Sequence, residues 1–105
     1  MSGTYVTDIT HYLNEAGELV GEMPAEARQL ASFLTLLIDE ASRSLPIQDH
    51  DSGVRCRVPS CQGSIRLTLE TPSDAIVWHC PTCGHNGIIH NWQGTKWNRS
   101  EEHVR

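Results

Sequence analysis

Residues 54–84 read VRCRVPSCQGSIRLTLETPSDAIVWHCPTCG and contain all four cysteines of the 105-residue chain. Four residues separate Cys56 from Cys61, and two residues separate Cys80 from Cys83. Each close pair can supply two thiolates from one tight turn, and four thiolates complete the tetrahedron that zinc prefers. The sequence therefore predicts one Zn²⁺ ion bound by these four cysteines. Because four thiolates leave no open position for water, we expect the ion to be structural.

The residues between the two cysteine pairs indicate how the sulfurs meet. Apolar and polar residues alternate at 64–70, a turn is predicted at 71–74, and a returning strand is predicted at 75–80. Two isoleucines at 88–89 predict a third strand. We therefore expect a small three-stranded antiparallel sheet with the metal held at one end.

The second cysteine pair lies in the pentapeptide CPTCG at 80–84, where proline rigidifies the turn and Gly84 can adopt a positive φ. This pattern resembles the CPxCG knuckles of the zinc ribbon superfamily, and the resemblance covers about residues 54–97. It implies a zinc ribbon stabilised by its metal. The first pair, with four intervening residues, departs from the commonest two-residue spacing. Residues 1–50 resemble no family.

Other chemistries of the cysteines fit the sequence less well than structural zinc. A disulfide framework is one alternative, but in a reducing compartment two close pairs are more often metal ligands. A rubredoxin-like iron site also uses CPxCG, but the wider first pair argues against it. A thioredoxin-like redox pair would need Cys80 exposed at the start of a helix, whereas Gly84 and another strand follow here. His79 and His85 flank the second knuckle, and beside four cysteines we interpret them as neighbours of the site rather than ligands.

Residues 24–45 predict one long helix, with Pro24 at its start, good helix formers throughout and Pro46 after its end. Its apolar residues cover more than half of the circumference, which is more than a small ribbon would cover. One hypothesis is that the helix packs on the rest of the chain. The other is a homodimer through the helix, with contacts from Leu30, Phe33, Leu34, Leu37 and Ile38.

The remaining segments are harder to assign. Residues 5–17 fit both a strand and a helix, and we favour a short helix capped by Asp8. Residues 46–53 are polar and turn-rich, which indicates a linker. The prediction is an α+β protein with a helical segment at 1–50 and, at 51–105, a zinc ribbon with a C-terminal tail.

Composition bounds the classes of function. Close cysteine pairs without a secretory signal indicate a reducing, cytoplasmic setting, and no apolar stretch approaches the roughly 18 residues of a membrane span. The net charge of −5 is uneven: residues 1–50 carry eight acidic and two basic residues, and residues 51–105 carry five acidic and six basic ones. This is not the strongly basic footprint of a nucleic-acid-binding protein.

The segment after the last predicted strand combines aromatic and basic residues. We expect Trp92, Lys96, Trp97 and Arg99 to contact a partner, as exposed aromatic rings flanked by cations do. The alternative is that the rings of Trp92 and Trp97 cover the small sheet. No catalytic motif is present, so an enzyme is not expected. The sequence favours a non-catalytic zinc module that binds another protein, with a nucleic-acid-binding ribbon as the alternative and a thiol redox protein as a weaker one.

Overall fold

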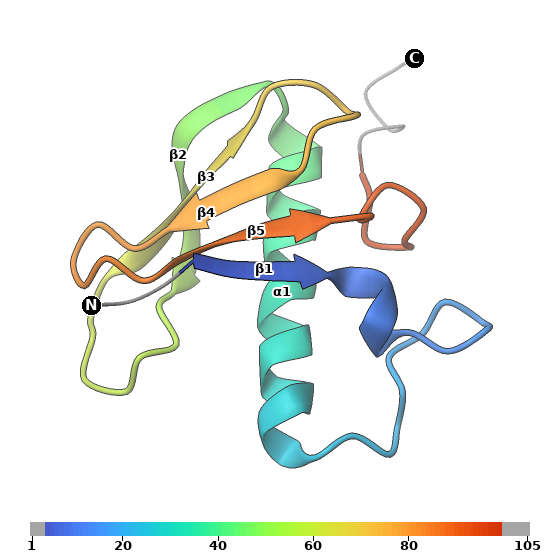
Figure 1. The fold of residues 1–105 in the computed structure, drawn as a ribbon. Helices are drawn as coiled ribbons and strands as arrows, with labels where there is room; N and C mark the ends of the chain where they lie inside the picture. The colour runs from blue at the N-terminus through green and yellow to red at the C-terminus, as the bar shows by residue number, and fades with distance from the viewer. Residues whose placement is uncertain (1–3, 100–105) are drawn as a thin grey trace.

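The computed structural model describes residues 4–99, in which one helix packs on a five-stranded mixed sheet (Figure 1). The chain order is β1 (Thr4–Asp8), the short 3-10 helix η1 (Ile9–Tyr12), α1 (Ala25–Ser44), β2 (Ile47–Arg55), β3 (Ser64–Leu69), β4 (Ile76–His79) and β5 (Asn86–His90). The strands lie in the order β1-β5-β4-β3-β2. In the view of Figure 1, α1 lies behind the sheet, so the front face of the sheet is open. No helix within residues 4–99 is long and apolar enough to cross a membrane.

The predicted three-stranded antiparallel ribbon is wrong, although the α+β class is correct. Strands β3, β4 and β5 form the expected antiparallel group, but each side of it gains a further strand. Strand β2 pairs antiparallel with β3, and β1 pairs in parallel with β5. The half of the chain that contains the four cysteines is therefore part of a broader sheet that includes β1.

Strand β2 occupies most of the segment that was predicted to be a linker. Its pairing with β3 shifts register twice, between Ile47 and His50 and between Asp51 and Arg55. Gly53 has a φ of +76°, which a glycine adopts without strain. The turn-like composition thus belongs to an irregular edge strand, a common way to keep an exposed strand edge from pairing with other chains. Residues 50 and 51, where we placed the boundary between the two parts, both lie within β2.

The N-terminal segment is a strand followed by a 3-10 helix, so the short helix predicted within residues 5–17 is present only as η1, and the strand-forming residues before it form β1. The strand-forming residues of β1 extend because they pair in parallel with β5, 82 positions further along the chain. Asp8 does cap a helix as expected, since its side chain accepts a hydrogen bond of 3.0 Å from the backbone N–H of Thr10.

The long helix predicted at 24–45 is confirmed as α1, and its apolar face packs inside the chain. The residues proposed for a dimer contact are largely covered by the sheet: Leu34, Leu37 and Ile38 are 0% exposed, Phe33 is buried and Leu30 is partly buried against the core. Five strands cover a wider helix face than three would. The apolar arc therefore gives no reason to expect a second copy on this face.

Candidate metal centre

The four cysteine sulfurs converge at one end of the β3–β4 hairpin. All lie within 4.8 Å of one another, with 3.7 Å between the Sγ atoms of Cys56 and Cys83 and 3.5 Å between those of Cys61 and Cys80. Four sulfurs placed about 2.3 Å from one zinc ion in a tetrahedron are about 3.8 Å apart. The cysteines are free thiols. The prediction that these four residues meet at one site is confirmed, and their spacing fits a tetrahedral metal ion.

The first knuckle connects β2 to β3 and is closed by backbone hydrogen bonds. The N–H of Cys56 donates to the carbonyl of Gly63 over 2.9 Å, and the N–H of Cys61 donates to the carbonyl of Val58 over 2.9 Å. The N–H of Gly63 also donates to the Sγ of Cys61 over 3.3 Å, which favours a thiolate at that position. The four-residue spacing is thus accommodated by a well-bonded turn.

The second knuckle connects β4 to β5 and has the geometry that its sequence predicts. The N–H of Cys80 donates to the carbonyl of His85 over 2.7 Å, and the N–H of Gly84 donates to the carbonyl of Cys80 over 2.8 Å. Gly84 has a φ of +85°, a conformation that favours glycine. The CPxCG pattern therefore forms the tight turn that presents its two sulfurs.

Gly63 is a part of the site that the sequence reasoning missed. A Cβ atom at this position would lie 2.7 Å from the Sγ of Cys80 and 2.6 Å from the Oγ1 of Thr82. Only glycine leaves room for the two knuckles to approach so closely. The signal in the sequence is that each cysteine pair is followed closely by a glycine: Gly63 comes two residues after Cys61, and Gly84 directly follows Cys83.

Burial and neighbouring groups shift the pKa values of Cys56, Cys61 and Cys80. Burial and the neighbouring sulfurs raise the pKa of Cys56 to about 12. At Cys61 the Gly63 N–H lowers the pKa, but burial and the sulfurs of the second knuckle outweigh it, so the pKa is raised. Burial also raises the pKa of Cys80, yet hydrogen bonds from the backbone N–H groups of Cys83 and Thr82, and from the Cys61 thiol, lower it to about 7. Several thiolates at this spacing therefore need a divalent cation to balance their charge.

The two histidines that flank the second knuckle have other contacts. The Nε2 of His79 lies 3.7 Å from an Asp49 carboxylate oxygen. The ring of His85 packs on Tyr5 and Trp78, with centroid distances of 4.9 and 5.6 Å. The cluster of potential ligands in residues 4–99 consists of cysteines alone.

The predicted partner-binding residues differ in exposure: Lys96 is exposed, Trp97 and Arg99 are partly buried, and Trp92 is buried. Trp92 is 0% exposed, and its Nε1 donates to the carbonyl of Asp74 over 2.8 Å. Trp97 is partly buried and packs against the core. The two cations form ion pairs: Lys96 lies 3.9 Å from Glu18, and Arg99 lies 3.5 Å from Asp39. This segment packs on the molecule, and Trp92 is part of the core.

The fold and the site together define a small α+β protein with a cluster of four cysteines, between two knuckles, that could hold a metal ion. No family model matches the chain, and neither a curated protein nor a solved structure matches it.

Proposed function

We propose that this protein is a non-catalytic, zinc-stabilised module that binds another protein. The observation that carries the proposal is the closed set of four sulfurs, all within 4.8 Å of one another. With four thiolates bound, zinc has no position for an activated water or a substrate, and such sites stabilise folds. The ion would tie the turn after β2 to the turn after β4.

Zinc is the metal that this ligand set favours. Thiolates in a tetrahedron suit both zinc and iron, and the four-residue first knuckle departs from the spacing of a rubredoxin-like iron site. The two knuckles on a β-hairpin also agree with the resemblance to zinc ribbons noted in the sequence.

A thiol redox function has less support. A redox-active pair needs an accessible attacking thiol, often at the start of a helix. Cys80 is 0% exposed, and its sulfur lies 3.5 Å from the sulfur of Cys61 in the other knuckle. Residues 81–85 form a turn that leads into β5.

Metal analysis tests the proposal directly. The protein would be purified without chelator from cells grown with both zinc and iron, and its metals measured by mass spectrometry. We expect one zinc per chain, and less than about a tenth of that in Cys61→Ser, because three thiolates bind zinc far more weakly. Ser60→Ala, an exposed neighbour in the same knuckle, is the matched control and should retain its zinc.

Thiol reactivity separates the structural interpretation from the redox one. Iodoacetamide should modify the zinc-loaded protein slowly and the chelated protein quickly, because a metal-bound thiolate is shielded. A folded protein that contains no metal, contains iron, or cycles Cys80 and Cys83 through a disulfide would contradict the proposal.

A further inference from the structure

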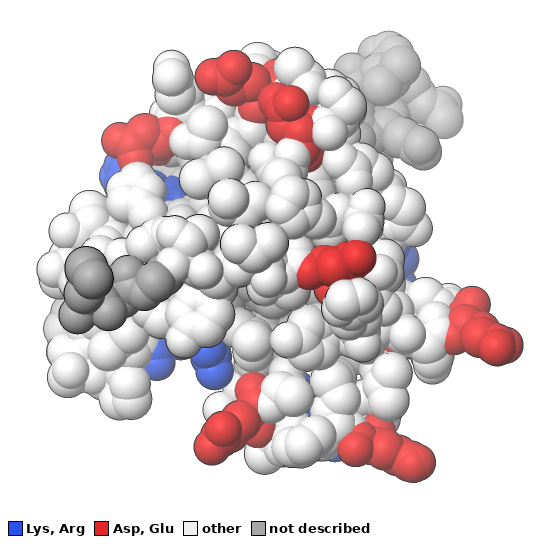
Figure 2. All heavy atoms as spheres, viewed as in Figure 1, with Lys and Arg blue, Asp and Glu red and all other residues white. Residues whose placement is uncertain are grey.

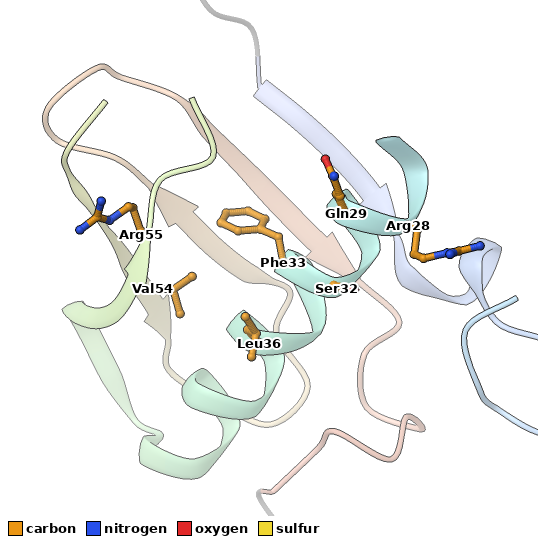
Figure 3. Close-up of a pocket in the computed structure, with 7 residues that line it drawn as sticks. All are labelled: Arg28, Gln29, Ser32, Phe33, Leu36, Val54 and Arg55. Carbon is orange, nitrogen blue, oxygen red and sulfur yellow. The ribbon is translucent and has the colours of Figure 1, made fainter. Parts of the chain in front are cut away.

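An open groove of about 500 Å³ lies between α1 and the end of β2 (Figure 3). Its centre is apolar and is formed by Phe33 and Leu36 of the helix and Val54 of the strand. Leu36 is 56% exposed, although it belongs to the apolar arc of the helix. Figure 3 shows Arg28 and Arg55 on opposite sides of these apolar side chains. The groove therefore combines an exposed apolar floor with a cation at each end.

The arginines at this groove differ from the other cations of residues 4–99. Each of the others forms an ion pair with a carboxylate; these are Arg43, Arg66, Lys96 and Arg99. Arg28, Arg55 and Arg57 form no ion pair with a residue of the described part of the chain. Arg28 donates to the carbonyl of Gly21 over 2.8 Å, and the guanidinium of Arg57 lies 5.8 Å from the centroid of the Phe33 ring. Three cations without a carboxylate thus gather at one place in a chain of net charge −5.

The groove continues toward the metal centre. A second hollow of about 330 Å³ is lined by Arg57, Val58 and Pro59 of the first knuckle, together with Tyr5 and His85. Gln29 lines both hollows. The surface therefore extends from α1 across Arg57 to the knuckle that contains Cys56.

The rest of the visible surface has the opposite character. Figure 2 shows the open face of the sheet, where acidic side chains surround a largely uncharged area and few basic side chains appear. The three arginines would attract a large polyanion, but the acidic side chains on this face would repel it.

We propose that the groove binds an acidic peptide segment of another protein, with one aliphatic side chain of the segment packed on Phe33, Leu36 and Val54. Its carboxylates pair with Arg28, Arg55 and Arg57. The proposal rests on the proposed function, and it names the surface and the chemistry of the partner.

Two physical terms favour this occupant. An aliphatic side chain would remove Leu36 and Val54 from water, and burial of apolar surface is the general driving force of such contacts. A guanidinium matches a carboxylate in planar, bidentate geometry, and here no carboxylate of the described chain competes for it. A nucleic acid would instead require a continuous basic track, whereas only three unpaired cations are present in residues 4–99.

The metal centre places two of the three arginines. Arg55 and Arg57 directly flank Cys56, so a metal bound at Cys56 fixes the backbone from which both side chains extend. Arg28 lies on α1 and does not depend on the knuckle in this way. Peptide binding should therefore weaken when zinc is removed, even while α1 stays helical.

The binding test uses a nuclear magnetic resonance titration of the zinc-loaded, ¹⁵N-labelled full chain. The probe is a nine-residue peptide with Leu at its centre and Glu at alternating positions on both sides of the Leu. We expect amide shifts that cluster at Gln29, Phe33 and Val54. Gly in place of the central Leu should weaken binding about fivefold, and Gln in place of every Glu should weaken it about tenfold at low salt. Equal binding of the all-Gln peptide, or no shifts at millimolar peptide, would overturn the proposal.

Variants of the chain locate the site. The triple variant Arg28→Gln, Arg55→Gln, Arg57→Gln should bind the peptide at least about tenfold more weakly. Arg43→Gln is the matched control, because Arg43 lies exposed on the same helix but pairs with Asp39 outside the groove. An equal loss in the control would show non-specific attraction and reject the groove. A single-stranded oligonucleotide that binds more tightly than the peptide through the same arginines would also reject it.

The zinc content and unfolding midpoint of every sample separate this proposal from the previous one. A folded chain with one zinc that binds no peptide rejects the groove and leaves the structural metal centre intact. A metal-free chain that binds the peptide with full affinity supports the groove and rejects the zinc-dependent placement of its arginines.

Discussion

Gly87 lies against the indole of Trp78, and the contact leaves no room for a side chain. A Cβ at position 87 would lie 2.5 Å from Cε2 and Cζ2 of that ring. Trp78 itself is 1% exposed and packs edge-on against Phe33, with a centroid distance of 5.3 Å. Because Trp78 and Phe33 are both buried in the core, the indole cannot easily move away from position 87.

We predict that Gly87→Ala lowers the free energy of unfolding by about 1–3 kcal/mol, since overpacking a core forces side chains from their preferred rotamers. Denaturant unfolding of the zinc-loaded protein measures the effect. Gly21→Ala is the control, because nothing lies within 4 Å of a Cβ there, and its effect should stay within about 0.5 kcal/mol. Equal stability of the two variants would show that the sheet adjusts around Trp78.

Gly63 has the same role between the two knuckles. Since a Cβ there would meet the Sγ of Cys80 at 2.7 Å, Gly63→Ala should push the knuckles apart and distort the tetrahedron of sulfurs. We predict that zinc affinity falls by about tenfold or more, the size of effect that residues supporting a metal site commonly have. Competition with a chromogenic chelator measures it, and Gln62→Ala, an exposed neighbour, should bind zinc as the wild type does.

At the scale of elements, Asp8 joins the end of β1 to η1 and to the turn after β5. Its carboxylate accepts hydrogen bonds from the hydroxyl and backbone N–H of Thr10 and, over 2.8 Å, from Nδ2 of Asn91. The Thr10 hydroxyl and then the Asn91 amide lower the pKa of Asp8. The charged form is therefore stabilised in the folded state.

A lowered pKa fixes the sign of the pH dependence. The contribution of Asp8 is fully present above the unfolded pKa of about 3.9 and is lost as the pH falls through the lower folded value. We predict that Asp8→Ala lowers the thermal midpoint at neutral pH and that ¹³C titration of the wild-type carboxyl gives a pKa below 3.9. A carboxyl that titrates at or above the unfolded value would contradict this reading of the junction.

The elements that were predicted correctly are those whose structure is determined by interactions between residues close in sequence. Helix α1 follows from its helix formers and flanking prolines, and the hairpin follows from the alternation at 64–70 and the polar turn after it. The four cysteines follow from their spacing, because each pair needs only a short turn. In these cases the decisive interactions lie within a few residues of one another.

The missed elements depend on distant partners. Strand β1 forms because it pairs with β5 at the other end of the chain, and a sequence window around Thr4–Asp8 does not contain that information. Strand β2 has the composition of a loop because its irregular pairing tolerates polar and glycine residues. Trp92 was assigned to a binding surface for a similar reason, since its place in the core depends on the turn at Asp74.

At the scale of the whole molecule, the extra strands change what the helix requires. The apolar arc of α1 was compatible with packing inside the chain or with a second copy, and β2, β3 and η1 cover most of it. What stays uncovered is local: Leu36, beside Phe33 and the arginines of the groove. A broad apolar helix face is thus divided between the core and the groove lined by Phe33, Leu36 and Val54.

The separation between the helix–sheet core and the two cysteine knuckles predicts how the molecule responds to metal removal. The core between helix and sheet contains large residues that are 0% exposed and are not metal ligands, among them Leu34, Leu37, Ile65 and Ile76. These contacts should hold α1 on the sheet when the sulfurs are released, whereas the knuckles lose the ion that joins them.

We therefore predict that a strong chelator lowers the thermal midpoint by roughly 20 °C, because several kcal/mol of metal binding free energy shift the midpoint by about 4–8 °C per kcal/mol in a domain of this size. The far-ultraviolet helix signal at 25 °C should persist, while amide resonances of residues 56–63 and 80–85 broaden or shift. Adding one equivalent of zinc should restore both. Complete loss of the helix signal would show that the metal holds the entire fold, and an unchanged midpoint would show that it stabilises none of it.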